Sequence, residues 1–504
     1  MPAIRVTYSG LISFSVSIIS LITGLVFTLV VTRQLTQEEF GTWSLIGVLT
    51  SYVLVIQPII NIWITREIAR DIDSGRTALI STSMFSGIGV ASYLILVFVV
   101  GKNVDVELEI LLFTAILVPV YFFRNLFAAI SLGHKPQLVE YGLLIFELTK
   151  IPLGFILVFY LDLGLMGAIL SVFFATLASL LFLGFSLKEL LIGEFRNEQL
   201  KKWLKLFWIP TYPQLNRILY NLDMVIFTLI SGAVGAIAYW GASVAISQSV
   251  IHSSKINVAL YPKLLGGGKK EILQENLLRV FYFSFPLSAM AITFAEPGLF
   301  TLNPLYREAT LVTIFLVLMV FQMSLFKVFS SFLGGIEKVD EDEKSTFMQY
   351  LKSKLFLLPT LALFQSGGYI ISLIIVLFIA NQRGLTDLEL VEIWALVAFI
   401  CYIPYTLTLY FLVRKEFSPS LQKSSLSKYF LASIVSFGFV YFLMQEYLIY
   451  QESIFEFLPS LIPYVILAVG MYLGITFATD FKTRILFRAV FKELRKKSSG
   501  VVDD

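Results

Sequence analysis

The sequence contains a single cysteine, Cys401, and only two histidines. One thiol cannot form a disulfide within the chain, and two imidazoles leave little from which to build a metal site. Charged residues are also scarce: they make up 14% of the 504 residues, whereas a soluble protein carries about 25%. Hydrophobic residues make up 57%, and the mean hydropathy is +0.82. Long, nearly charge-free stretches recur along the whole chain, which is typical of a polytopic membrane protein.

Helices long enough to cross a bilayer need about 20 residues for roughly 30 Å of hydrocarbon. On that basis the sequence predicts an all-α polytopic membrane protein with about fourteen transmembrane helices. The predicted spans are 10–32, 41–64, 79–101, 110–132, 141–161, 163–187, 207–231, 235–262, 278–300, 310–333, 355–381, 390–413, 428–450 and 458–478.

The basic residues predict the orientation of these spans. With both termini in the cytoplasm, nearly all lysines and arginines outside the spans fall in inner segments; the outer segments hold only Arg33, Lys102, Arg307 and Arg383. This bias is the one that the positive-inside rule requires. No segment between spans is long enough to fold alone. An enzyme with an outer domain, such as a polymerase or an oligosaccharyltransferase, is therefore not expected.

The two halves of the chain share a short internal repeat. "LTQEEFGTWSLIGVL" (35–49) follows the first span and aligns with "GAVGAIAYWGASVAI" (232–246), which follows the seventh. "SLGHK" (131–135) corresponds in the same way to "GGIEK" (334–338). We therefore expect two six-helix bundles in parallel pseudo-repeat, 1–200 and 201–427, facing a central cavity as alternating access requires. An extra helix pair, 428–480, and a basic cytoplasmic tail, 481–504, complete the predicted chain.

The stretch "TRQLTQEEFGTWSLI" resembles the polysaccharide flippases of the Wzx type, which share a superfamily with lipid II flippases and multidrug (MATE) exporters. "NLDMVIFTLISGAVGAIAYWGAS", around the turn after the seventh span, carries the same resemblance. The twelve-plus-two plan matches along essentially the whole chain.

The resemblance implies that this protein is a transporter of the plasma membrane and not an enzyme. It would flip a polyprenyl-diphosphate-linked oligosaccharide or polysaccharide unit from the inner to the outer leaflet, for cell-surface polysaccharide or glycoprotein synthesis. The implied partners are the lipid-linked sugar and membrane lipids, without nucleic acid or cofactor. A monomer is expected, with glycan-assembly enzymes as candidate associates. The alternative is a MATE-like, cation-coupled antiporter of drugs or other small molecules.

The span 207–231 is unusually polar for a membrane helix. A charge at the bilayer centre costs at least about 2.5–3.5 kcal/mol, so such residues usually face protein or a wet cavity. At 100° per residue, one stripe is formed by Tyr212, Asn216, Tyr220 and Asp223, and a second, beside it, by Gln214, Arg217 and Asn221. This helix is therefore expected to line a binding site.

Polar residues at membrane depth supply the predicted substrate site. The candidates are Arg124, Arg217, Lys255, Lys150, Asn216, Tyr220, Asn221, Gln248, Gln57 and Asn61. Guanidinium and ammonium groups pair with phosphate oxygens, which fits a diphosphate, whereas the amides and tyrosines fit sugar hydroxyls. Cations outnumber carboxylates at membrane depth, and this favours an anionic substrate over the cationic drugs of an antiporter.

Three residues are candidates for coupling transport to H⁺ or Na⁺: Asp223, Glu147 and His252. Competing interpretations remain for each. Glu147 and Lys150 are three residues apart, so they share a helix face and fit a mutually neutralising structural pair. His252 fits packing as well as function. Asp223 is also one carboxylate that Arg217 could neutralise across the bundle, although the two residues lie about 120° apart on their own helix.

Overall fold

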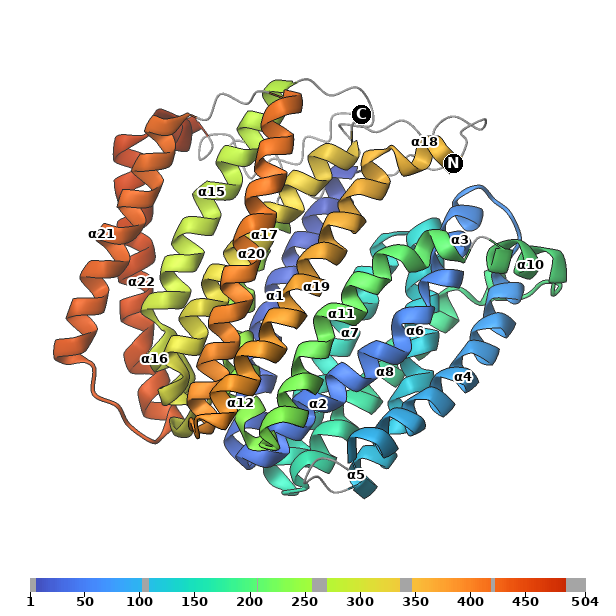
Figure 1. Cartoon of the computed structure of the whole chain (residues 1–504), viewed down its shortest axis with the longest axis horizontal. Helices are drawn as coiled ribbons and strands as arrows, with labels where there is room; N and C mark the ends of the chain where they lie inside the picture. The colour runs from blue at the N-terminus through green and yellow to red at the C-terminus, as the bar shows by residue number, and fades with distance from the viewer. Residues whose placement is uncertain are drawn as a thin grey trace, which may run out of the picture. The chain divides into compact units, whose positions relative to one another are not determined.

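The computed structural model describes residues 6–101, 108–205, 207–255, 270–335, 347–417 and 422–485. Every regular element in these ranges is a helix (Figure 1). The predicted all-α fold is therefore confirmed.

The first half of the chain contains the helices that carry most of the predicted site. They are α1 (Val6–Gln34), α2 (Gln37–Val53), η1 (Leu54–Ile56), α3 (Pro58–Ala69), α4 (Gly75–Gly101), α5 (Leu108–Phe113), η2 (Thr114–Ile116), α6 (Leu117–His134), α7 (Gln137–Gly154), the π-helical η3 (Phe155–Tyr160), α8 (Gly164–Ser186), α9 (Lys188–Leu191) and α10 (Asn197–Lys205).

The second half begins with the polar helix noted in the sequence. Its elements are α11 (Trp208–Ser231), α12 (Val234–Ser247), η4 (Gln248–Ile251), α13 (His252–Lys255), α15 (Lys270–Thr293), α16 (Ala295–Leu302), η5 (Pro304–Ala309), α17 (Thr310–Gly335), α18 (Phe347–Leu351), α19 (Lys354–Gln382), α20 (Asp387–Phe417), α21 (Lys423–Tyr447) and α22 (Ile454–Thr479).

Eleven helical segments of the described chain are long and apolar enough to cross a membrane, and a twelfth results if the pair α15 and α16, bent by 62°, is one span. The predicted count of fourteen is therefore not confirmed. Two predicted spans are not among the eleven or twelve. The helix at 10–32 contributes only a shorter apolar segment, Ile22–Gln34. The helix at 207–231 is α11, whose polar residues lower its hydropathy.

The chain divides into two compact units, which differ from the bundles predicted from the repeat. The first comprises Met1–Ala245, Leu305–Leu316 and Glu337–Tyr405, and the second Ile246–Pro304, Val317–Ile336 and Thr406–Asp504. The six-plus-six division remains a prediction.

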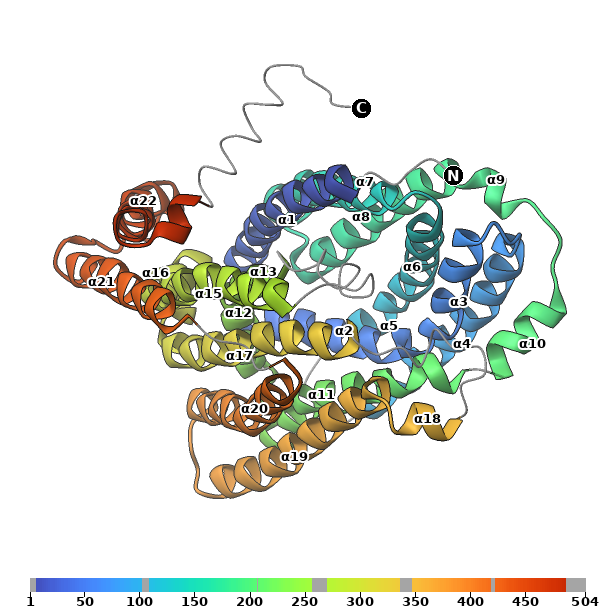
Figure 2. The ribbon, with the colours of Figure 1, turned by 90° about the horizontal axis from the view of Figure 1, so that it is seen from above.

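The core of the first unit lies where α3, α4, α6 and α8 pack together (Figure 2). Ile64, Leu126 and Ile130 are fully buried there. The indole of Trp203, from the short helix α10, closes this core and donates a 3.0 Å hydrogen bond to Glu67 Oε1 of α3. Close packing of these side chains, together with the hydrogen bond of Trp203, holds the helices that position the site, because association of membrane helices depends on van der Waals contact and not on removal from water.

Helix α2 crosses α12 at very close range in the first unit. A Cβ atom at Gly41 would lie 2.1 Å from the carbonyl oxygen of Val234, and one at Gly241 would lie 2.6 Å from Ser44 Oγ. These are the two segments that the internal repeat aligns. Their contact requires glycine because any side chain at Gly41 would overlap the backbone of α12.

The second unit contains α15, α21 and α22, which lie side by side (Figure 1). Tyrosines fill their contact: Tyr472 Oη donates to the carbonyl oxygen of Tyr282 at 2.6 Å, and the rings of Tyr282 and Tyr429 meet edge to face. Asp480, just after α22, accepts a 2.8 Å hydrogen bond from Tyr429 Oη of α21. The last two long helices are thus joined at this end as well as along their length.

Candidate functional site

The first polar stripe of α11 contacts α19. The contacts are Tyr212 Oη with Thr360 Oγ1 (2.6 Å), Ser366 Oγ with Asn216 Oδ1 (2.5 Å), the ring of Tyr220 with that of Tyr369 (5.6 Å between centroids), and Tyr369 Oη with Asp223 Oδ2 (2.8 Å). Asn216 and Tyr220, which were predicted to contact sugar, therefore join two helices of the first unit. This stripe satisfies its polar groups within the protein.

Asp223 is buried at the end of that stripe. Its carboxylate accepts hydrogen bonds from Tyr369 Oη at 2.8 Å and from the backbone N–H of Met224 at 2.7 Å. Trp394 Nε1 in turn donates to Tyr369 Oη at 2.8 Å. No ion pair to Asp223 is found among the described residues. Neutral donors, rather than a cation, hold this carboxylate.

Arg217, of the second stripe of α11, lines a cavity of about 620 Å³ in the first unit, which we call the arginine cavity. It is lined by Phe27, Thr28, Val31, Phe40, Trp43, Ser44, Ile46, Gly47, Thr50, Ser51, Leu54, Leu117, Tyr121, Arg124, Asn125, Arg217, Met224, Trp240, Gly241, Val244 and Ala245. The predicted residues Arg124 and Arg217 meet there. Asn221, the third member of the stripe, donates a 2.7 Å hydrogen bond to Ser51 Oγ.

The arginine cavity is basic. Its lining contains two arginines and, among the described residues, no aspartate or glutamate. Arg217 is exposed, and no hydrogen bond or ion pair joins its side chain to the described part of the chain. A guanidinium in this state has its five N–H donors free for a ligand. Five aromatic side chains also line the cavity, Trp43 and Trp240 among them.

Arg124, the second arginine, is half-buried on α6. Its Cζ atom lies 4.6 Å from the centroid of the Phe146 ring, and Lys150 Nζ lies 4.8 Å from the same centroid. The ring of Phe27, which lines the cavity, is 5.2 Å from Lys150 Nζ. Cation–π contacts therefore hold the two cations in place without neutralising Arg124.

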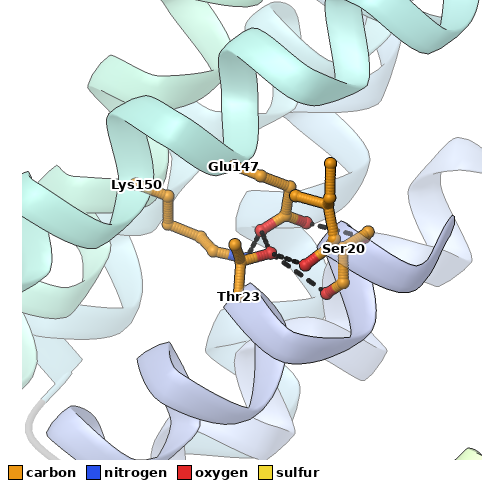
Figure 3. A network of polar contacts seen from close by, with 5 residues as sticks. Ser20, Thr23, Glu147 and Lys150 are labelled. Carbon is orange, nitrogen blue, oxygen red and sulfur yellow. Dashed lines mark hydrogen bonds and ion pairs between the residues drawn. The ribbon is translucent and has the colours of Figure 1, made fainter. Parts of the chain in front are cut away.

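Glu147 and Lys150 form a buried ion pair on α7, with 2.7 Å between Oε2 and Nζ (Figure 3). Ser20 Oγ donates to Glu147 Oε1 at 3.0 Å, and Thr23 Oγ1 donates to Oε2 at 2.9 Å. The pair therefore connects α7 to α1 through both carboxylate oxygens. This geometry favours the interpretation as a neutralising structural pair.

The other predicted residues are placed elsewhere. Gln57 is buried: its Nε2 donates to the carbonyl oxygen of Phe122 at 2.8 Å, and its Oε1 accepts from Asn125 Nδ2 at 2.6 Å. Asn61 lines a second cavity, described below. Gln248, His252 and Lys255 belong to the second unit, in η4 and α13, and the side chain of Lys255 lies outside the described part.

Sequence reasoning missed Asn125, Ser51 and Trp240 as lining residues. Asn125 could have been found, because an amide next to Arg124 in an apolar span is as unusual as the arginine itself. Ser51 and Trp240 give no such signal, since serine and tryptophan are ordinary residues of membrane helices. Among the described residues, no three His, Cys, Asp or Glu side chains come together as a metal site would require.

No protein-family model matches the sequence, and a search of curated proteins finds no relative. Solved structures do match. The lipid II flippase MurJ, in an inward closed conformation, is 16% identical with a TM-score of 0.63, covering 95% of this chain and 100% of that one. An inward-facing multidrug resistance MATE family transporter of the MOP superfamily is 15% identical, with a TM-score of 0.57 over 79% of this chain and 94% of its own. A mutant of the Vibrio cholerae MATE transporter VcmN is 15% identical, with a TM-score of 0.53 over 81% and 96%. The chain thus has the fold of these membrane transporters.

Proposed function

We propose that this protein flips a polyprenyl-diphosphate-linked oligosaccharide or polysaccharide unit from the inner to the outer leaflet of the plasma membrane. It would act as a monomer with both termini in the cytoplasm. The observation that carries the proposal is the charge of the arginine cavity: Arg124 and Arg217 line it, and none of its lining residues in the described chain is acidic.

The chemistry of the cavity matches the headgroup of such a substrate. A diphosphate presents several anionic oxygens, and an arginine fork can bind two of them at once. Beside the arginines, Asn125 offers hydrogen bonds to sugar hydroxyls through its Oδ1 atom and its second amide N–H, since the first N–H donates to Gln57. Trp43 and Trp240 add flat apolar surfaces. The fold also supports the proposal, since one of the similar structures is described as a lipid II flippase.

The second candidate function is multidrug antiport, because other similar structures are MATE transporters. A cationic drug in the arginine cavity would lie beside two like charges and no carboxylate. Like-charge contacts select against such a ligand. The fold alone does not separate the two functions, whereas the charge of the cavity favours the anionic substrate.

The proposal also includes one residue that couples transport to an ion gradient. We propose Asp223 as the coupling carboxylate, for H⁺ or Na⁺, because it is buried and forms no ion pair with any described residue, whereas Glu147 is already paired with Lys150. Transport driven by an imposed pH gradient or an imposed Na⁺ gradient would identify the ion. If transport by Asp223→Asn were still driven by that ion gradient as in the natural chain, Asp223 would have no coupling role.

The proposed substrate is tested with the purified protein in liposomes. The probe is a fluorescent undecaprenyl-diphosphate disaccharide, whose movement between leaflets is followed by a membrane-impermeant quencher. We expect the probe to be flipped, an undecaprenyl glycoside without phosphate to stay in place, and the cationic dye ethidium not to be transported. Transport of ethidium without movement of the diphosphate lipid would support the antiporter and overturn the flippase.

A further inference from the structure

A second cavity, of about 530 Å³, lies in the first unit between α3, α6, α7 and α11. Three of its lining residues carry an amide or guanidinium group: Asn61, Arg66 and Gln214. The wall is otherwise mainly apolar, with Ile62 and Leu132 among its members. We call it the Arg66 cavity.

The Arg66 cavity lies next to the arginine cavity. Three helical segments line both cavities, and on each of them the residue that lines the Arg66 cavity is about one turn away from the residue that lines the arginine cavity. The α2–α3 segment contributes Leu54 to the arginine cavity and Pro58 to the Arg66 cavity; α6 contributes Asn125 and Ala128, and α11 contributes Arg217 and Gln214. Each step is three or four residues, or about 5 Å along a helix. On all three helices the step runs toward the end that the basic residues predict to be cytoplasmic.

An amide pair lies at the level between the two cavities. Gln57, between Leu54 and Pro58 in the chain, accepts a hydrogen bond from Asn125 Nδ2 at 2.6 Å. Asn125 itself lines the arginine cavity. Polar side chains, and not only apolar ones, therefore lie at the level between the two cavities.

Three polar side chains of the Arg66 cavity have no partner among the described residues and can bind a ligand. The hydroxyl of Thr65 is already used, because it donates to the carbonyl oxygens of Asn61 and Ala129, both at 2.9 Å. The side chains of Asn61, Arg66 and Gln214, by contrast, make no hydrogen bond or ion pair within the described part of the chain, and Arg66 is exposed. Within the described lining, no carboxylate opposes the guanidinium.

We propose that the Arg66 cavity is the loading site for the diphosphate end of a lipid-linked substrate, which passes from there to the arginine cavity. The inference rests on the proposed function and assigns it a first binding step, with Arg66 as the residue that captures phosphate. A guanidinium beside an apolar wall fits an amphiphile, whose phosphates pair with Arg66 while its first isoprene units contact Ile62 and Leu132. Free phosphate would contact only the guanidinium of Arg66 and not the apolar wall.

The test uses thiol protection in the full chain with Cys401→Ser. Ala128→Cys reports on the Arg66 cavity and Ser44→Cys on the arginine cavity, and each is labelled with a fluorescent maleimide. Farnesyl diphosphate is the probe. We expect it to slow labelling at both positions, whereas farnesol and inorganic pyrophosphate protect Ala128→Cys much less.

The matched variants are Arg66→Ala and Arg70→Ala. Arg70 follows Arg66 by one turn, at the end of α3, is also exposed and lines neither cavity. Arg66→Ala should raise the farnesyl diphosphate concentration for half-protection of Ala128→Cys by about tenfold, as expected for losing one charge-assisted contact. Arg66→Lys should lose less, and Arg70→Ala should leave protection unchanged.

Several outcomes would overturn the loading site. Equal protection by farnesol would show that the cavity binds the chain and not the phosphates, and equal protection by pyrophosphate would show a site for free anions. Protection at Ser44→Cys without protection at Ala128→Cys would remove the loading site while leaving the proposed function intact. Protection at neither position would count against both. Leu132→Cys repeats the measurement if Ala128→Cys fails to fold.

Discussion

Tyr369 of α19 donates a 2.8 Å hydrogen bond to the buried carboxylate of Asp223 on α11, across 146 residues of chain. The same hydroxyl accepts from Trp394 Nε1 of α20 at 2.8 Å. Trp394 stacks on Trp240 of α12, with 3.7 Å between ring centroids. The hydroxyl of Tyr369 thus connects three helices of the first unit, and the stacked tryptophans add a fourth.

Removing that hydroxyl with Tyr369→Phe should destabilise the protein. Both the Asp223 acceptor and the Trp394 donor would lose a partner in a buried place, at a cost of about 1–3 kcal/mol for each unsatisfied group. A lower thermal unfolding midpoint in detergent would show this. Tyr306→Phe is the control, because the Tyr306 hydroxyl is buried with no hydrogen-bond partner in the described structure. Equal effects of the two substitutions would contradict the role of Tyr369.

Arg217 should affect transport without affecting stability. Its side chain is exposed in the arginine cavity and makes no ion pair with Asp223 or with any other described residue. We expect Arg217→Ala to lower flipping of the diphosphate lipid by roughly 10- to 100-fold. Arg217→Lys should keep part of the activity, since the charge remains but the planar fork is lost. The unfolding midpoint should not change.

The double variant Arg217→Ala/Asp223→Ala separates a substrate contact from a structural one. If Arg217 served to neutralise Asp223, removing both charges should restore the transport that removing one abolished. The geometry predicts no such rescue, because Tyr369 and the Met224 N–H already hold the Asp223 carboxylate. Recovered transport in the double variant would reassign Arg217 to the scaffold.

The ion pair between Glu147 and Lys150 should behave in the opposite way, as a structural unit (Figure 3). Glu147→Gln leaves a buried ammonium group unpaired, and breaking a buried pair on one side costs about 3–5 kcal/mol. Glu147→Gln/Lys150→Met should recover most of that loss in thermal unfolding. For comparison, Asp73→Asn disrupts an exposed contact with Arg196 at 3.9 Å, which is worth about 1 kcal/mol or less. A double variant less stable than Glu147→Gln alone would exclude the structural role.

Sequence periodicity located the polar stripes of α11 but not their partners. A 100° repeat fixes the angle between Asp223 and Arg217 on the helix, so two separate faces could be predicted. Which face meets α19 and which meets a cavity depends on Ser366 and Tyr369, more than 140 residues away, and no local pattern encodes that contact. Asn216 and Tyr220 were therefore assigned to sugar binding, although the structure places them against α19.

The helix count also shows that a local sequence pattern does not reveal tertiary contacts. Apolar length finds eleven or twelve spans, and α11 falls outside them because its polar residues lower its hydropathy. Hydropathy does not measure the tertiary contacts that hold part of these groups, such as those of Asn216 and Asp223 with α19. The Glu147–Lys150 pair was predictable because three residues separate its members. Its hydrogen bonds from Ser20 and Thr23 of α1 were not, since they depend on how α1 packs on α7.

Gly41 should control the approach of α2 to α12. A Cβ atom there would lie 2.1 Å from the Val234 carbonyl oxygen, so Gly41→Ala must push the two helices apart, at about 1–3 kcal/mol. In the Cys401→Ser background, Ser44→Cys should then react faster with a membrane-impermeant maleimide added outside, where this end of α2 is predicted to lie. Gly47→Ala is the control, because a Cβ atom at Gly47 meets nothing within 4 Å. Slower labelling in Gly41→Ala would contradict this contact.

Asp480 should stabilise the junction of α21 and α22 in a pH-dependent way. Its carboxylate accepts hydrogen bonds from Ser425 Oγ (2.9 Å), Tyr429 Oη (2.8 Å) and the N–H of Thr483 (3.0 Å). Burial raises the pKa of Asp480, but the hydrogen bonds from Tyr429, Thr483 and Ser425 lower it further than burial raises it, so the net pKa lies below the ordinary value. A carboxyl group whose pKa is lower in the folded state stabilises fully above its unfolded pKa of about 3.9, and that stability is lost as the pH falls through the folded value.

Asp480→Asn should therefore lower the thermal unfolding midpoint at neutral pH, by a loss of about 1–3 kcal/mol for hydrogen bonds to a charged group. The difference between the natural chain and the variant should stay constant from pH 7 to about pH 5 and shrink only near and below about pH 4. Glu446→Gln serves as the control, because Glu446 is exposed near the end of α21 and makes no hydrogen bond or ion pair within the described residues. A difference that already shrinks between pH 7 and pH 5 would mean that burial outweighs the hydrogen bonds, so that the pKa of Asp480 is raised and its carboxylate does not stabilise the junction.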